Sequence, residues 1–408
     1  MNDQAYLLRT TGKTPMRIAV VTETYPPEVN GVAMTITRMI DVLLTSGHQV
    51  QLIRPRQHKA DRPSIHSNLE VILTRGMPLP GYPDLKLGLP AKQTLKRLWH
   101  VRRPDIVHIV TEGPLGRSAL VAAREIDLPV SSDFHTNFHQ YSRHYGVGWL
   151  HKPISAYLRR FHNRTDATLV PTVSLQDSLR LEGYQAVHVV TRGVDTQRFN
   201  PERRSVALRA QWGAGHDEPV ALYVGRLAPE KNIPLVLQAF DCMTELEPAT
   251  KLVLVGDGPS RTALQAQYPQ HIFAGMRTGD DLATHYASAD IFLFPSLTET
   301  YGNVTVEAMA SGLAVVAYDY AAAGQLILDG ENGFLACCGE GEVDAFIAAA
   351  LRALLEPLRR STARRHAREA AERLSWQHVV SDFEAILHQI MARHEQDSFR
   401  SAALLGAE

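Results

Sequence analysis

Short apolar runs alternate with helical stretches along most of the chain, and this alternation restricts the fold more than any other feature. In the first half the apolar, β-branched runs cover 16–23, 48–53, 69–73, 104–110, 128–134 and 167–172. The pattern restarts in the second half at 219–225, 250–256, 289–295 and 313–319. Strands that alternate with helices pair in parallel and are covered on both faces. The chain is therefore predicted to have an α/β fold with two doubly wound, Rossmann-like parallel sheets.

A polar, turn-rich stretch near 193–215 separates the two halves. We expect an N-terminal domain over 16–193 and a second domain over 194–374, while the periodicity allows the helical stretch 375–391 to close either of them. Ligands of such sheets bind beyond the carboxyl ends of the strands. The two domains are therefore expected to face one another across a ligand-binding cleft.

Composition narrows the class of protein. The 408 residues are 45% apolar and 21% charged, with a formal net charge of −1, which is typical of a globular protein and gives no reason to expect nucleic acid as a partner. The three cysteines, Cys242, Cys337 and Cys338, fit neither a disulfide framework nor a zinc site. No apolar run approaches the ~18 residues that span a membrane, and the amino end lacks the apolar core of a signal peptide. A cytoplasmic enzyme is expected.

The loop after the first strand does not carry the glycine pattern of a dinucleotide site. It reads TYPPEVNGVAMT over 24–35, and its one glycine, Gly31, stands where a helix over about 32–46 is expected to begin. The pyrophosphate of a nicotinamide or flavin cofactor needs three glycines at this turn. A dehydrogenase is therefore disfavoured and no cofactor is expected, although Gly31 leaves helix amides open to another anion.

A strand of the second half runs into the loop VGRLAPEKN, over 224–232, which places two cations close to a glycine. Gly225 allows a ligand to approach the backbone, while Arg226 offers a fork of donors and Lys231 a point charge. A diphosphate would suit this pair. On spacing alone, an ordinary solvated turn is the more frequent explanation of such a loop.

The segment PSLTETYGNVTVEAMASG, over 295–312, places a carboxylate on each side of the start of a helix. Asn303 is predicted to be the N-cap of a helix over 304–310, whose free amides would point into the cleft and suit a phosphate. The carboxylates of Glu299 and Glu307 would repel a phosphate but suit the hydroxyl groups of a sugar. The alternative is that Glu299 is solvated and Glu307 only favours the helix dipole.

Three histidines lie close together in DFHTNFHQYSRHYG, at His135, His139 and His144. Their spacing could fit one helix face, but no cysteine and few carboxylates accompany them, so no metal site is predicted. His135 follows a strand end and is expected to contact substrate. His139 and His144 are expected to be surface or packing residues.

Together these motifs resemble a known family. GRLAPEKN, DGP, SLTETYGNVTVEAMASG and RGVD are similar to the retaining family 4 glycosyltransferases, which have the GT-B fold. TETYPPEVNGVA and SSDFHTNFHQYSRHYGVGWL resemble the branch that contains sulfoquinovosyl-diacylglycerol synthases and GDP-mannose-dependent α-mannosyltransferases acting on lipids. The resemblance extends over about 17–390. It implies that the first domain binds the acceptor, that the second binds a nucleotide sugar, and that the last helix, 375–395, crosses back to complete the first domain.

The resemblance also implies catalytic roles for His135, Glu299, Arg226 and Lys231 and a substrate-binding role for Glu307. Arg226 and Lys231 match the pair that holds the diphosphate. Glu307 matches the residue that holds the nucleotide ribose, Glu299 the residue near the donor hexose, and His135 the histidine beside the reacting hexose.

Further residues are expected to bind substrate through the backbone or at close range. They are Gly31, Gly225, Tyr301, Gly302, Asn303 and Val304. By resemblance, the amides from Gly302 to Val304 cradle a phosphate and Gly31 meets the donor from the opposite domain. Tyr301 stands where the family often has Phe.

The expected reaction moves a hexose, mannose or glucose, from a GDP- or UDP-sugar to a hydroxyl of a lipid or lipid-linked glycan, with retention of configuration. The sequence has no Asp-x-Asp pair, which would normally hold a divalent ion on the diphosphate. Arg226, Lys231 and a helix terminus could neutralise the leaving group without metal. Two alternatives stay open, a sugar-nucleotide epimerase of the same fold and a non-catalytic nucleotide-sugar-binding protein.

Basic residues concentrate in the first half. Residues 86–164 contain thirteen Lys or Arg against five acidic residues. Within 90–104, Leu95, Leu98 and Trp99 form an apolar helical stripe flanked by cations. Such a helix either lies on an anionic membrane or covers a sheet and exposes a basic face to solvent. The first interpretation predicts a peripheral location on the inner face of the cell membrane.

Overall fold

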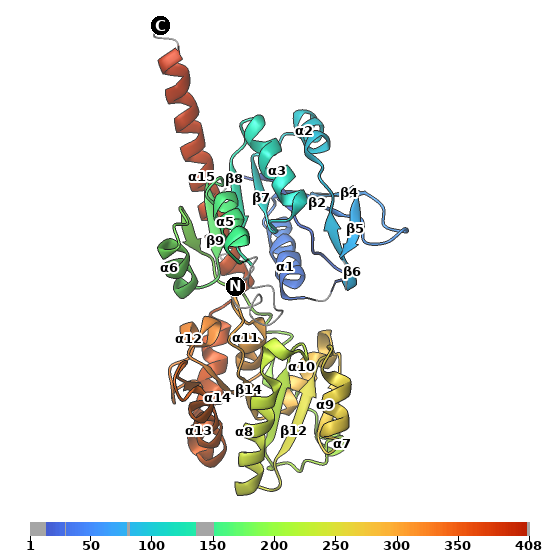
Figure 1. The fold of residues 1–408 in the computed structure, drawn as a ribbon, viewed down its shortest axis with the longest axis vertical. Coiled ribbons are helices and arrows are strands. Elements are labelled where there is room, and N and C mark those ends of the chain that lie inside the picture. Colours follow the sequence, from blue (N-terminus) through green and yellow to red (C-terminus); the bar gives the residue numbers. More distant parts are fainter. Residues whose placement is uncertain (1–13, 29, 80–81, 136–150, 406–408) are drawn as a thin grey trace, which may run out of the picture.

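The computed structural model describes residues 14–28, 30–79, 82–135 and 151–405. They form two lobes, each built on its own sheet, and the chain passes from the first lobe to the second and then back (Figure 1). Helices cover both faces of each sheet. The predicted α/β fold with two doubly wound, Rossmann-like sheets is confirmed.

The sheet of the first lobe has the strand order β10-β9-β8-β7-β1-β2-β4-β3. Its strands are β1 (Arg17–Val21), β2 (Gln49–Pro55), β3 (Ser64–His66), β4 (Leu69–Thr74), β7 (Ile106–Ile109), β8 (Val130–Asp133), β9 (Ala167–Val170) and β10 (Val187–Val189). Every pairing is parallel except that of β3 with β4. The central strands are buried along almost their whole length, as expected of parallel strands covered on both faces.

The helices of the first lobe fall into two layers. They are α1 (Gly31–Thr45), α2 (Lys92–Val101), α3 (Pro114–Glu125), α5 (His151–His162) and α6 (Val173–Leu181). Apolar residues of α1 pack on one face of the sheet, and those of α2 and α3 pack on the other. A separate antiparallel pair, β5 (Gly76–Leu79) with β6 (Tyr82–Gly88), lies beside this lobe.

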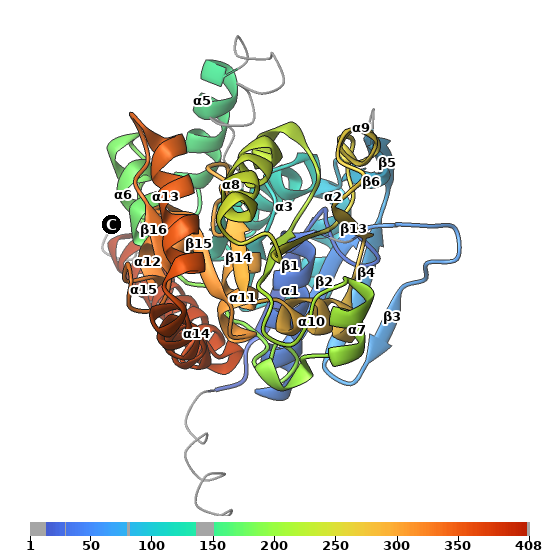
Figure 2. The ribbon, with the colours of Figure 1, turned by 90° about the horizontal axis from the view of Figure 1, so that it is seen from below.

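The sheet of the second lobe is entirely parallel, with the order β13-β12-β11-β14-β15-β16. Its strands are β11 (Val220–Val224), β12 (Lys251–Val255), β13 (Ile272–Gly275), β14 (Ile291–Phe294), β15 (Ala314–Tyr318) and β16 (Phe334–Ala336). Its helices are α7 (Val206–Gln211), α8 (Ile233–Leu246), α9 (Arg261–Gln267), α10 (Gly279–Ser288), α11 (Asn303–Ala310), α12 (Ala321–Leu326), α13 (Glu342–Leu355) and α14 (Pro357–Glu372), with 3-10 turns η3 (Pro201–Arg203) and η4 (Pro229–Lys231). Figure 2 shows α8 and α13 on one face of this sheet and α10, α11 and α14 on the other.

The last helix, α15 (Trp376–Leu405), leaves the second lobe and packs on the first (Figure 1). Its buried residues Val380, Phe383 and Leu387 belong to the same apolar cluster as residues of α1 and β1. The His48 ring fixes this docking, because its Nδ1 accepts a hydrogen bond from the Met16 amide at 3.0 Å and its Nε2 lies 3.1 Å from Glu384 Oε1. The helix extends well beyond the 375–391 stretch expected from periodicity.

Helix α2 covers the sheet. Leu95 and Trp99 are fully buried against α3 and the strands, and Leu98 packs at the edge of the same cluster. The interpretation of this apolar stripe as a membrane-binding face is therefore wrong, because the residues that would enter a lipid surface belong to the core. Lys92 and Lys96 both pair with Glu125 of α3, at 2.9 and 2.8 Å.

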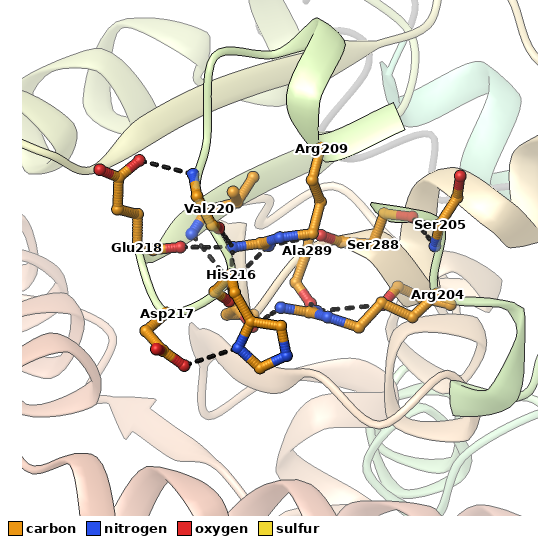
Figure 3. A network of polar contacts seen from close by, with 12 residues as sticks. Arg204, Ser205, Arg209, His216, Asp217, Glu218, Val220, Ser288 and Ala289 are labelled. Atoms are coloured by element: carbon orange, nitrogen blue, oxygen red, sulfur yellow. Dashed lines mark hydrogen bonds and ion pairs between the residues drawn. The ribbon is translucent and has the colours of Figure 1, made fainter. Parts of the chain in front are cut away.

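Three arginines gathered around the buried Asp290 hold together the end of the second lobe that lies away from the first. Asp290, which precedes β14, accepts from Arg204 and Arg209 at 3.0 Å each and from Arg364 at 3.1 Å. Arg209 also donates to the Ser288 and Glu218 carbonyls at 2.8 and 2.6 Å, as Figure 3 shows. These partners tie α7 and α14 to the start of β14. Because ligands of such sheets bind at the opposite, carboxyl ends of the strands, the cluster has a structural role.

Candidate active site

Two helices begin at the junction between the lobes and direct their amino ends at one another. Helix α1 follows β1 and helix α11 follows β14, so both start at the carboxyl edge of a sheet. The Asn303 side-chain nitrogen lies 3.4 Å from the Gly31 carbonyl oxygen and 3.4 Å from Thr35 Oγ1. Free amides and partial positive charge from both helices therefore meet at one place, which favours an anion.

The start of α11 differs from the prediction. The N-cap is Gly302, with a φ of 91° and no side-chain cap, and Asn303 is the first helical residue. The predicted cap at Asn303 is therefore wrong. A glycine suits the cap because other residues rarely adopt this backbone conformation. Asn303, released from capping, extends its side chain to the first lobe instead.

Lys231 and Glu299, which are 68 residues apart, meet beside this point as an ion pair. Lys231 lies at the end of η4 after β11, and Glu299 lies in the loop before α11. The side chains are only 14% and 19% exposed, and Ser296 Oγ also donates to Glu299 at 2.9 Å. Glu299 is therefore not a solvated surface carboxylate. Arg226 follows the same strand as Lys231 and contacts Glu230 Oε1 at 3.4 Å.

Glu307 lies one turn inside α11, and its carboxylate is hydrogen-bonded to a tyrosine of α10. The hydroxyl of Tyr286, a fully buried residue of α10, donates to Glu307 Oε2 at 3.0 Å. Burial raises the pKa of Glu307 to about 7, and the hydrogen bond from Tyr286 opposes that rise. The carboxyl group therefore titrates near neutral pH, in contrast to a solvated residue that merely favours the helix dipole.

His135 follows β8 and both of its ring nitrogens have partners. Nε2 lies 3.1 Å from Asp133 Oδ2, and Nδ1 lies 3.1 Å from the Nη2 atom of Arg192. Asp133 also faces the His108 ring at 3.5 Å. Burial opposes ionisation of Asp133, but the two histidines lower the pKa of its carboxyl well below the usual range.

Tyr301 and Gly225 have partners within the protein, and their substrate contacts stay predictions. The Tyr301 ring is buried in the core of the second lobe, and its hydroxyl donates to the Arg192 carbonyl at 3.2 Å. A Cβ at Gly225 would lie 2.7 Å from the Tyr223 hydroxyl, so the neighbouring tyrosine already requires glycine there. Gly302, Asn303 and the half-buried Val304 stay at the junction, where the start of α11 offers its amides.

Sequence reasoning missed three side chains at this junction, namely Asp133, Arg192 and Tyr286. Asp133 and Arg192 stand inside the motifs SSDFH and RGVD, so the signal was present but no partner was assigned. His139 and His144 lie outside the described residues. Within the part of the chain that the structure describes, no group of three His, Cys, Asp or Glu side chains could hold a metal ion.

Comparison with known proteins agrees with this geometry. A model described as Glycosyltransferase Family 4 matches residues 29–198, and one described as Glycosyl transferases group 1 matches residues 218–356. The chain is 35% identical over 333 residues to a GDP-mannose-dependent α-mannosyltransferase of Mycobacterium tuberculosis, which covers 80% of this chain and 85% of that protein. It is 30% identical over 372 residues to a sulfoquinovosyl transferase of Arabidopsis thaliana, covering 89% of this chain and 71% of that one.

Solved structures agree at the level of the fold. The sucrose-phosphate synthase of Thermosynechococcus elongatus matches with a TM-score of 0.76 at 19% identity, covering 93% of this chain and 100% of that one. The family models together reach both lobes, and the curated relatives match over most of their own length. The chain therefore belongs to the family 4 glycosyltransferases, and its two lobes are those of the GT-B fold.

Proposed function

We propose that this glycosyltransferase moves a hexose from a nucleoside diphosphate sugar to a hydroxyl of a lipid or lipid-linked acceptor, with retention and without a metal ion. The observation that carries the proposal is the meeting of the α1 and α11 amino ends beside Lys231, Glu299 and Glu307. Positive potential at one point suits a diphosphate. Carboxylates on either side suit the hydroxyls of its ribose and its sugar.

The residues divide the donor between them. The amides that begin α11, with Lys231 and Arg226, neutralise the negative charge that develops on the diphosphate as the bond to the sugar breaks. Glu307 accepts from the ribose hydroxyls, because it lies on the same helix as the phosphate cradle. Glu299 lies in the loop before that helix and accepts from the hexose. Lys231 lies between the diphosphate side and the hexose side of the donor, since it is ion-paired with Glu299.

Retention follows from attack on the face that the diphosphate leaves. The bond from the anomeric carbon to the phosphate oxygen breaks, a bond to the acceptor oxygen forms on the same face, and the acceptor proton passes to the departing phosphate oxygen. No step requires a covalent sugar–enzyme intermediate. His135 lies on the first lobe beside this junction, where it can contact the hexose during transfer.

Contact with a membrane surface is proposed to depend on charge. In the described residues no helix is both long and apolar enough to cross a bilayer. The apolar stripe of α2 is buried, but Arg97 of α2 and Lys152, Arg159 and Arg160 of α5 are exposed. Each such cation close to anionic lipid contributes about 1 kcal/mol, reduced by salt. This surface would hold the first lobe against a membrane that contains the acceptor.

A donor panel tests the proposed function. Purified protein is incubated with GDP-mannose, UDP-glucose or UDP-sulfoquinovose and vesicles of a bacterial glycolipid extract, in EDTA or in Mg²⁺, and nucleoside diphosphate release is followed. We expect release that requires vesicles, persists in EDTA and yields an α-linked product from an α-linked donor. Sugar interconversion without vesicles would indicate an epimerase, binding without turnover would indicate a binding protein, and activity restored only by Mg²⁺ would contradict metal independence.

A further inference from the structure

Arg192 contacts both lobes, one through its guanidinium group and the other through its backbone carbonyl. It lies on the segment that leaves β10 for the second lobe, and its side chain is buried. The guanidinium Nη2 is 3.1 Å from His135 Nδ1 in the first lobe. Its carbonyl oxygen accepts from the Tyr301 hydroxyl of the second lobe at 3.2 Å, and Thr191 Oγ1 donates to the same hydroxyl at 3.3 Å.

The chemistry of arginine determines the tautomer of His135. A guanidinium has donors only, so the Nδ1 atom that faces it must be an acceptor. The ring proton of neutral His135 then lies on Nε2, where Asp133 Oδ2 accepts it at 3.1 Å. The second neighbour of Asp133 is His108, whose Nδ1 is 3.0 Å from Ser131 Oγ. The orientation of His135 is thus set from both ends.

The same contacts connect this tautomer to the loop before α11. Tyr301 lies two residues after Glu299 and immediately before the Gly302 cap. A shift of that loop would reach the backbone of Arg192 through the Tyr301 hydroxyl, and would reach His135 through the Arg192 side chain. The lobe that carries the Glu299 and Glu307 carboxylates is therefore linked mechanically to the histidine of the other lobe.

We propose that Arg192 is a positioning residue for sugar transfer, which holds His135 in its Nε2-protonated tautomer and couples it to the loop before α11. The proposal rests on the proposed function, because it assigns His135 to the reacting sugar. In this role Arg192 acts through His135 and not by contact with the donor. Substitution of Arg192 should therefore lower kcat and leave the affinity for the donor almost unchanged.

The tautomer is tested in the intact wild-type chain without any activity assay. Protein labelled with ¹⁵N in histidine is compared with His135→Gln to identify the resonances of His135, since Nδ1 and Nε2 differ strongly in shift according to which one carries the proton. We expect the signature of Nε2–H in wild type and a mixed or reversed signature in Arg192→Met. A wild-type His135 protonated at Nδ1 would overturn the proposal.

A double-mutant cycle tests whether Arg192 acts through His135. Arg192→Met should lower kcat by about 10- to 100-fold, as expected for a buried charged hydrogen bond, with the donor dissociation constant changed less than about 3-fold. Arg192→Lys keeps one cationic donor and should recover most of the rate. In a His135→Ala background, Arg192→Met should have almost no further effect. An equal further loss there would overturn the proposal.

Arg38 offers a matched control. It is a second arginine that bonds the same connecting segment, through Asp195 at 3.0 Å. Among the described residues it forms no hydrogen bond or ion pair with His135, Asp133 or Arg192. Arg38→Met should change kcat by less than about 2-fold. It should leave the His135 resonances unchanged. A fall in kcat as large as that of Arg192→Met would show a general effect of the interlobe connection and would overturn the specific role. Failure of the proposed function would instead appear as absent transfer by wild type, with the tautomer result intact.

Discussion

Glu307 differs from an ordinary helix glutamate because its pKa is about 7. Between pH 4.5 and 7 the unfolded chain loses the proton of this group while the folded chain keeps it, so folding stability from this group falls as pH rises. Between pH 5 and pH 8 the unfolding free energy of wild type should therefore fall by about 1–3 kcal/mol relative to that of Glu307→Gln, which has no carboxyl group to titrate at this position. Urea denaturation at both pH values measures it.

Tyr286→Phe is the companion to that measurement. It removes the hydrogen bond that lowers the pKa of Glu307, so the pH-dependent loss of stability should extend to higher pH than in wild type. Wild-type and Glu307→Gln curves that run parallel from pH 5 to pH 8 would contradict the elevated pKa.

Glu299 and Glu307 should respond differently to substitution because Glu299 is ion-paired with Lys231, whereas Glu307 is hydrogen-bonded to Tyr286. Glu299→Gln removes the negative charge beside Lys231, so affinity for bare GDP or UDP should stay equal or increase while sugar transfer falls. At pH 8, where the Glu307 carboxyl is mostly ionised, Glu307→Gln should weaken bare nucleotide and intact donor alike, by about 10- to 100-fold for a charged acceptor worth roughly 1.5–3 kcal/mol. Calorimetric titration decides between these outcomes. Equal weakening of bare nucleotide by both substitutions would refute the division.

The sequence was informative about the site where chemistry is local. Glu299, Gly302 and Glu307 lie within one short segment, so a strand end followed by a helix start was enough to bring them together. The contact between Arg192 and His135 joins residues 57 apart, and the ion pair between Lys231 and Glu299 joins residues 68 apart. Such pairings depend on strand order, which periodicity does not specify.

Two substitutions in α2 test whether this helix packs in the core or binds a membrane. Trp99 is fully buried, so Trp99→Ala should cost about 3–5 kcal/mol of unfolding free energy. Arg97 on the same helix is exposed, so Arg97→Ala should change stability by less than about 0.5 kcal/mol. Urea unfolding of both variants is the measurement. A stable Trp99→Ala variant with reduced vesicle co-sedimentation would restore the membrane interpretation.

Elements with a continuous apolar run were predicted well, since burial on both faces leaves a strong signal. β1, β11 and β14 all fall within their expected runs. The short edge strand β3 and the β5–β6 pair were missed because partly exposed antiparallel strands lack such a run. The length of α15 was also missed, because residues 392–398 are mostly exposed and the apolar period is lost there.

At the scale of the whole molecule, the first lobe depends on the last helix. Val380, Phe383 and Leu387 fill the cluster shared with α1 and β1, whereas α14 belongs to the core of the second lobe through Ala363, Ala367 and Ala371. A chain that ends at residue 374 should therefore lose amide-exchange protection in β1, β2 and α1. Protection in β11, β12 and β14 should persist. Equal loss in both sheets, measured by hydrogen exchange, would show that the lobes fold as one unit.

Because the chain passes between the lobes twice, the two cores are completed in a fixed order during synthesis. The Val194 amide donates to the Leu374 carbonyl at 2.9 Å, so the entry and exit of the second lobe lie side by side and the whole lobe is an insertion within the first. A ribosome that adds about 5–20 residues per second releases the second lobe complete while the first still awaits α15. The earliest part of the chain to be made is thus the last to complete its core, and until α15 is made the apolar face that α15 covers stays exposed.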